Sequence, residues 1–216
     1  MNTALPLTAL CIALAGVAGP AQATALATET AVNTVTIVTT PFGGTLLASA
    51  ITLISNASYN GIARSAVYDT GTGLDFYYQF SNDITSVNGI ERFTGYNFTS
   101  LGATSIVDVY QTAGAFDIFL RGTETADGAD RTSLGVIGFS FVPNGFSKIN
   151  PGSTSYTEII RTNARAYTSG NFGLLDGIGD NARGFAPAAI PEPGTMALSL
   201  AGLAAVGSVV ARRRVS

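Results

Sequence analysis

A strict alternation of apolar and polar side chains over residues 74–81 is the feature that most limits what this chain can fold into. Its apolar positions are Leu74, Phe76, Tyr78 and Phe80, and the positions between them are Asp75, Tyr77, Gln79 and Ser81. Successive side chains of a β-strand point to opposite faces, so this segment predicts a strand with one apolar face. Turn-forming residues at 69–73 and 81–83 mark its ends. We expect this strand to lie at the centre of the core.

Short apolar segments separated by turn signals continue along the chain. Strands are expected at residues 32–38, 45–54, 62–68, 92–98, 105–110, 115–120, 136–142, 155–161 and 164–167. Nothing in this region repeats apolar residues with a period of 3.6, so long helices are not expected there. Glycine accounts for 25 of the 216 residues and charged residues for only 12%, which suits strands joined by tight turns. The sequence predicts an all-β domain, an antiparallel β-sandwich or jelly-roll-like ectodomain, over residues 24–186.

The C-terminal segment, residues 187–216, has a different composition. Pro191, Glu192 and Pro193 precede an uncharged apolar run at 195–211, and Arg212, Arg213 and Arg214 follow that run. As a helix the run would be roughly 25 Å long, close to the ~30 Å of a bilayer core. Basic residues beside a membrane helix favour the cytoplasmic side. We therefore expect a single transmembrane helix with its C-terminus inside the cell.

The N-terminal segment has the pattern of a secretory signal peptide. Residues 5–18 are almost wholly apolar, and Ala21 and Ala23 provide small side chains for cleavage, although no lysine or arginine precedes the run. We expect a signal peptide at 1–23. Cys11, the one cysteine, lies in this segment, so the exported domain would depend on its core rather than on disulfides. The alternative is a lipidated Cys11, but Leu10 stands before it where a small residue is expected.

The order of Pro-Glu-Pro, apolar helix and arginine cluster resembles the PEP-CTERM sorting signal of Gram-negative bacteria. The resemblance implies that exosortase, a membrane-embedded cysteine peptidase, recognises and cleaves this segment. The protein would then be exported through the inner membrane, held there transiently by its C-terminal helix, and passed to the cell surface or beyond. The alternative is an ordinary tail anchor that contains an incidental Pro-Glu-Pro.

Short phrases within the domain also resemble the ectodomain common in PEP-CTERM proteins. They are residues 73–82, residues 138–141 with 151–155, and residues 162–167 before Asp176 and Gly177. This resemblance implies association with extracellular polysaccharide or biofilm matrix, and it brings no catalytic residues. The favoured expectation is a structural surface or matrix protein.

Residue usage argues against catalysis. The chain has no histidine, and its cysteine lies outside the expected domain, so the usual general base, the thiol nucleophile and a histidine zinc site are missing. A Ser–Lys pair would have to use Lys148 beside Ser147, in an expected turn. A glycosidase needs two facing carboxylates, but Asp75, Asp108 and Asp117 fall on the expected solvent side of their strands. We expect no enzyme activity and no cofactor, with a hydrolase as an alternative.

Charge argues against a nucleic-acid partner. The chain carries 11 basic and 14 acidic residues. Three of the basic residues are Arg212, Arg213 and Arg214, which leaves eight for the rest of the protein. An acidic domain with a single lysine offers no patch for phosphate backbones.

Two acidic, glycine-containing loops are weak candidates for calcium, which prefers carboxylate and carbonyl oxygens. One loop contains Asp127 and Asp130, and the other contains Asp176 and Asp180. Neither has EF-hand spacing, and Asp-Gly is first of all a turn signal. We therefore expect no bound metal.

Tyrosines spread along the domain motivate the alternative function of a lectin-like module for exopolysaccharide, because flat rings stack on sugars. The candidates are Tyr59, Tyr68, Tyr77, Tyr96 and Tyr110. Rings gathered on one exposed face would favour this alternative.

Overall fold

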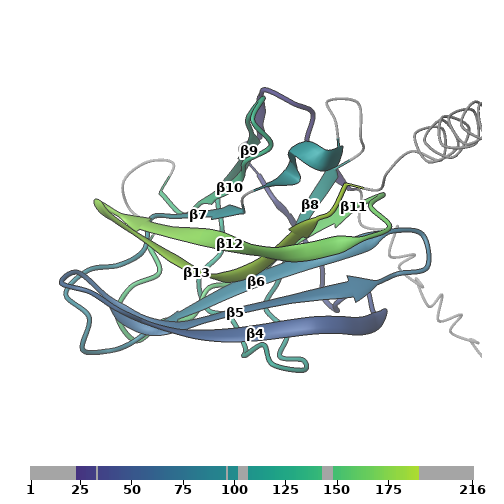
Figure 1. The fold of residues 1–216 in the computed structure, drawn as a ribbon. Helices are drawn as coiled ribbons and strands as arrows, with labels where there is room; N and C mark the ends of the chain where they lie inside the picture. Colours follow the sequence, from purple (N-terminus) through teal and green to yellow (C-terminus); the bar gives the residue numbers. More distant parts are fainter. Residues whose placement is uncertain (1–22, 33, 96, 102–106, 143–147, 190–216) are drawn as a thin grey trace, which may run out of the picture.

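The computed structural model describes residues 23–32, 34–95, 97–101, 107–142 and 148–189. Two β-sheets pack face to face (Figure 1). Sheet A has seven strands in the order β1–β8–β11–β6–β5–β4, with β3 beside β8, and sheet B has six in the order β13–β12–β7–β10–β9–β2. Both sheets are antiparallel except for the short parallel pairing of β3 with β8. The prediction of an all-β fold with antiparallel sheets is confirmed.

The strands of sheet A are β1 (Thr24–Ala25), β3 (Thr36–Ile37), β4 (Thr45–Ser55), β5 (Asn60–Asp69), β6 (Leu74–Asn82), β8 (Val107–Thr112) and β11 (Thr157–Thr162). Those of sheet B are β2 (Thr30–Val32), β7 (Arg92–Gly95), β9 (Gly128–Arg131), β10 (Ile137–Ser140), β12 (Tyr167–Asp176) and β13 (Ile178–Pro187). A single 3-10 turn, η1 (Phe98–Leu101), is the one helical element of the described residues.

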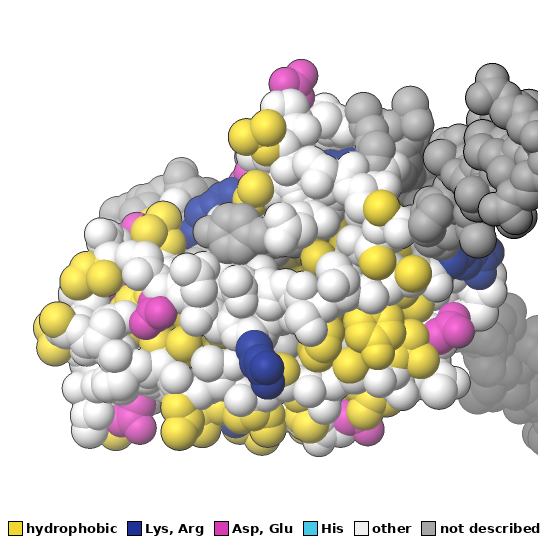
Figure 2. All heavy atoms as spheres, in the orientation of Figure 1, with side chains coloured by type: hydrophobic (Ala, Val, Ile, Leu, Met, Phe, Trp, Pro, Cys, Tyr) yellow, Lys and Arg dark blue, Asp and Glu magenta, His cyan; other side chains and the backbone are white. Residues whose placement is uncertain are grey.

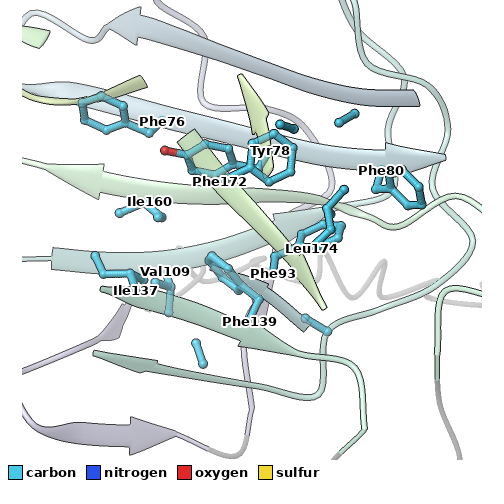
Figure 3. Packing of buried hydrophobic residues seen from close by; sticks show 14 of the residues in the cluster. Phe76, Tyr78, Phe80, Phe93, Val109, Ile137, Phe139, Ile160, Phe172 and Leu174 are labelled. Atoms are coloured by element: carbon cyan, nitrogen blue, oxygen red, sulfur yellow. The ribbon is translucent and has the colours of Figure 1, made fainter. Parts of the chain in front are cut away.

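Strand β6 lies inside sheet A, between β11 and β5, as its alternating pattern predicted. Its residues Phe76, Tyr78 and Phe80 point toward sheet B and are at most 2% exposed (Figure 3). Phe76 meets the ring of Phe98 at 5.2 Å, and Tyr78 meets Phe172 at 5.1 Å. These ring contacts join the two sheets, and hydrophobic burial of this kind is the main source of the domain's stability.

The other face of β6 is also buried, which corrects the expectation that it meets solvent. Asp75, Tyr77 and Gln79 are each at most 1% exposed. The segment after β8 covers them: the Gln79 side chain accepts a hydrogen bond from Leu120 N–H and donates one to Leu120 O, at 2.9 and 2.7 Å. The ring of Phe119 lies 5.9 Å from that of Tyr77. Strand β6 is therefore packed on both faces, by sheet B and by this covering segment.

Several predicted strands have different limits in the structure. The expected strand at 32–38 contains β3 and only the last residue of β2, and these two short strands belong to different sheets. Residues 115–120 form a turn closed by the pairing of Phe116 with Phe119, and they cover sheet A instead of joining it. The acidic segment at 127–131 contains β9, and the loop expected around Asp176 is the turn of the long hairpin β12–β13.

The described strands span most of the region expected to form the domain. β1 begins at Thr24 and β13 ends at Pro187. The expected transmembrane helix at 195–211 and nearly all of the expected signal peptide lie outside the described residues. Among the helices that the structure describes, none is long and apolar enough to cross a bilayer.

Candidate functional site

An ion pair between Asp75 and Arg161 is the main charged feature on the outer face of sheet A. β6 and β11 place the two residues directly opposite each other. Arg161 Nε and Nη2 donate to the two carboxylate oxygens of Asp75, at 3.0 and 2.7 Å. The guanidinium lies 3.7 Å from the centre of the Phe42 ring. Planar pairing and ring stacking are the contacts for which arginine is best suited.

This environment assigns Asp75 a structural role. Burial raises the pKa of the Asp75 carboxyl, while the hydrogen bonds and charge of Arg161 oppose the rise. Asp108, across the strand from Arg161, also has a pKa raised by burial. Asp117 is exposed, as expected, and accepts a hydrogen bond from Tyr68 Oη at 2.7 Å. Because Asp75 is completely covered and held by Arg161, it is not placed as the exposed carboxylate of a hydrolase.

The tyrosine rings are buried, contrary to the expectation behind the lectin-like alternative. Tyr59, Tyr68, Tyr77 and Tyr110 are each at most 5% exposed, and Tyr96 lies outside the described residues. Three of them form a second apolar cluster with covering residues: Tyr68, Tyr77 and Tyr110 pack with Val38, Phe42, Ala66, Phe116, Ile118, Phe119 and Ile159. The rings stabilise the covering segments and offer no face to a sugar.

Three of the four calcium candidates, Asp130, Asp176 and Asp180, bond to other side chains of the protein. Asp130 forms a paired contact with Arg92, at 2.6 and 2.9 Å. Arg92 reaches it across Gly138, where any side chain would collide with the guanidinium. Asp127 lies just before β9, and its pKa is raised by burial. No group of three or more carboxylate, histidine or cysteine side chains in the described part of the chain could hold a metal ion.

The second calcium candidate loop contributes to a polar network at the end of the β12–β13 hairpin. Asp176 accepts hydrogen bonds from Ser58 Oγ at 2.7 Å and from Lys148 Nζ at 3.2 Å. Lys148 also pairs with Glu91 at 2.7 Å. Asp180 accepts a hydrogen bond from Asn56 at 3.4 Å. These contacts fix the hairpin end to the β4–β5 turn.

Lys148 is consequently held in its charged form. Its bond to Glu91 raises its pKa, burial acts in the opposite direction, and Asp176 adds to the rise. A Ser–Lys nucleophile would need a neutral lysine to accept the serine proton. Ser147 lies outside the described residues. The environment of Lys148 thus favours a structural role.

One buried residue was missed by the sequence reasoning. Glu158, on β11, is fully buried and sits opposite Tyr78 on the face that points into the core. Neither carboxyl oxygen has a hydrogen-bond partner among the described residues. Burial raises the pKa of this carboxyl well above its usual range, because a charged group without a partner is costly in the core. The neighbouring residues did not indicate that Glu158 is buried, since Thr157 and Ile159 are compatible with either face of the strand.

Replacing Glu158 by glutamine tests this environment. The folded protein holds the Glu158 proton at pH values where the unfolded chain has released it, so wild-type stability should fall as pH rises above the usual glutamate value of 4.5. The slope contributed by this group is at most about 1.4 kcal/mol per pH unit. Glu158→Gln should remove this contribution and be the more stable protein at pH 7–8. Denaturant unfolding from pH 4 to 8 measures the stability of both proteins. Stability curves that run parallel over this pH range would contradict a buried, protonated Glu158.

The C-terminal segment starts where the sandwich ends. Pro187 is opposite Tyr167 in the β12–β13 hairpin, and Ala188 N–H donates to Ala166 O at 2.9 Å. Pro191, Glu192, Pro193, Arg212, Arg213 and Arg214 lie outside the described residues. Only residues 188–190 therefore separate the last strand from the Pro-Glu-Pro sequence.

Comparison with known families identifies this segment. Residues 189–214 match the family model of the PEP-CTERM protein-sorting motif. The match includes the Pro-Glu-Pro sequence, the apolar run and all three arginines, so the suspected motif is confirmed. Comparisons with curated proteins and with solved structures found no match. The motif supports an exported protein that exosortase processes.

Proposed function

We propose that the chain is a structural protein of the cell surface or extracellular matrix, associated with exopolysaccharide and without enzyme activity. The sorting motif directly behind a folded β-sandwich is the observation that carries this proposal. The domain supports it in a second way. Its candidate catalytic groups, Asp75 and Lys148, are engaged in ion pairs.

A processing step follows from this proposal. Exosortase removes the C-terminal helix after the sandwich has crossed the inner membrane, and the domain then leaves the membrane. The prolines keep residues 191–193 out of helix and sheet, and Glu192 resists entry into lipid. From these residue types we expect a segment that a membrane-embedded peptidase can reach.

Replacing Pro191, Glu192 and Pro193 together by alanine should abolish this processing without altering the sandwich. Wild type and variant are expressed in a host with and without exosortase, and the mass of the released protein is compared. We expect wild type to lose its tail only where exosortase is present, and the variant to stay uncut in the membrane fraction. Equal trimming of both proteins, or trimming that does not depend on exosortase, would reduce the tail to a simple anchor.

The lectin-like alternative has less support. It depended on exposed tyrosine rings, and the four described candidates are covered. Binding of the released domain to a glycan array distinguishes the two functions, because a lectin would retain defined sugars and a structural domain would not.

A further inference from the structure

The last strand of sheet A, β4, has an apolar and uncharged free edge. None of its eleven residues is charged and none is proline. Leu47, Ile51 and Leu53 are 40%, 58% and 80% exposed. Figure 2 shows hydrophobic side chains, with a few acidic ones between them, in the lower part of the molecule, where Figure 1 places β4 and a loop below it. Proteins ordinarily block such an edge with charges, prolines or bulges. β4 has one irregularity, near its start, between Leu46 and Ala48.

The neighbouring edge of sheet B, formed by β13, is blocked, in contrast to the β4 edge of sheet A. β13 lies over β4 and β5, and side chains of sheet A bind its outward backbone groups. Arg183 N–H donates to Thr52 Oγ1 at 3.1 Å, and Arg183 O accepts a hydrogen bond from Ser65 at 2.8 Å. Phe185 O accepts a hydrogen bond from Tyr78 at 2.7 Å. Among the described residues, the same side of the sandwich therefore has one edge closed by hydrogen bonds, that of β13, and one edge without a neighbouring strand, that of β4.

The hairpin geometry identifies the open groups of β4. At the turn, Asn56 N–H donates to Tyr59 O at 3.1 Å. Backbone bonding alternates along an antiparallel pair, so every second residue before Asn56 is bonded to β5 and those between point away from it. The residues whose backbone N–H and C=O groups point away from β5 are Ser49, Ile51, Leu53 and Ser55. Further toward the start, Leu47 O accepts a hydrogen bond from Tyr167 at 3.4 Å. The open stretch thus runs from Ser49 to Ser55.

We propose that β4 pairs with β4 of a second copy of this chain, antiparallel, about a two-fold axis at Thr52. An axis perpendicular to the sheet keeps each side chain on its own face, so a residue must pair with one an even number of positions away. Centred on Thr52, the axis pairs Ser49 with Ser55 and Ile51 with Leu53. Each residue whose backbone groups point away from β5 in one copy then faces such a residue in the other copy.

The side chains support a second copy as the occupant of this edge. Ile51 and Leu53 of both copies would form one apolar cluster on the outer face, continuing the pairing of Leu53 with Ile62 in the hairpin. A charged peptide would find no opposite charge on β4. On the inner side, a hollow of about 180 Å³ lies beside Ala48, Ala50 and Phe185. Two seven-stranded sheets would become one continuous sheet, whatever the protein's role after export.

Lysine substitution tests the interface in the full-length chain, purified in a mild detergent. Sedimentation from about 1 to 100 µM, the range expected for a small interface, should show dimers of wild type and of Leu134→Lys. Leu134 is 76% exposed and lies outside β4, so it is the matched control. Ile51→Lys should be monomeric, with Leu53→Lys as a second variant if the first does not fold. A monomeric wild type, or dimers that persist in both lysine variants of β4, would overturn the proposal.

Cysteine cross-linking tests the register. With Cys11→Ser as background, Thr52→Cys supplies the single thiol of the chain. At the axis, residue 52 faces its own copy with Cα atoms about 4.5 Å apart, within disulfide range. Mild oxidation should link Thr52→Cys chains into dimers and leave Val87→Cys chains, exposed in a loop, as monomers. Equal linking of the two variants would contradict pairing at Thr52.

Discussion

Replacing Phe76 by alanine should lower the free energy of unfolding by ~3–5 kcal/mol, a large share of the total for a domain of this size. Phe76 is fully buried on the inner face of β6 and packs edge-to-face against Phe98. Its removal takes away buried apolar surface and leaves a cavity that two sheets joined by ring contacts cannot easily close. Denaturant unfolding of the domain, as a chain ending at Ala188, measures the loss.

Ile84→Ala is the matched control for this measurement. Ile84 is 79% exposed, so its truncation should change stability by less than ~0.5 kcal/mol. A loss at Phe76 no larger than that at Ile84 would show that β6 does not form the centre of the core.

Replacing Arg161 by methionine should cost a similar amount, ~3–5 kcal/mol, for a different reason. Methionine keeps much of the apolar volume but leaves Asp75 buried without its partner. The pKa of Asp75, already raised by burial, would rise further because the opposing charge is gone. The loss should therefore be greatest at pH values where Asp75 is ionised, and smaller in acid.

A double-mutant cycle separates the pair from its surroundings. Asp75→Leu combined with Arg161→Met removes both charges, and an apolar replacement of a buried pair is often close to neutral. We expect the double variant to be more stable than Arg161→Met alone at pH 7. If its losses are simply the sum of the two single losses, the ion pair does not couple the strands.

The sequence predicted the strands of sheet A best where their pattern repeats over many residues. β4, β5 and β6 were found nearly to their limits, because long alternating or apolar runs allow few other structures. β2 and β3 were merged because a two-residue strand has no period to detect. The hairpin β12–β13 was missed because its glycine-rich sequence resembles a loop. Its strands are held in place by hydrogen bonds to each other, which the side-chain pattern does not show.

The candidate sites depended on which faces are covered, and local sequence does not contain that information. Alternation correctly showed that Asp75 and Tyr77 share a face of β6. The burial of this face depends on the packing of Val38, Phe42 and the segment 113–126 against it, and these residues are far away in the chain. The sorting motif could be predicted because its recognition depends on consecutive residues and not on a distant partner.

Because the connection between β13 and the Pro-Glu-Pro sequence is short, the space around that sequence depends on whether β13 has folded. β13 is the last described strand of the chain, and it covers β4 and β5, so the sandwich cannot close before the chain as far as Pro187 is available to fold. Residues 188–190 then span at most about 10 Å. A closed domain would therefore hold Pro191 close to the end of β13, whereas a domain without β13 in place would leave ten more residues of unfolded chain before the motif. The length of this connection therefore determines how much space a peptidase has at the motif, and the folding of β13 reduces that space.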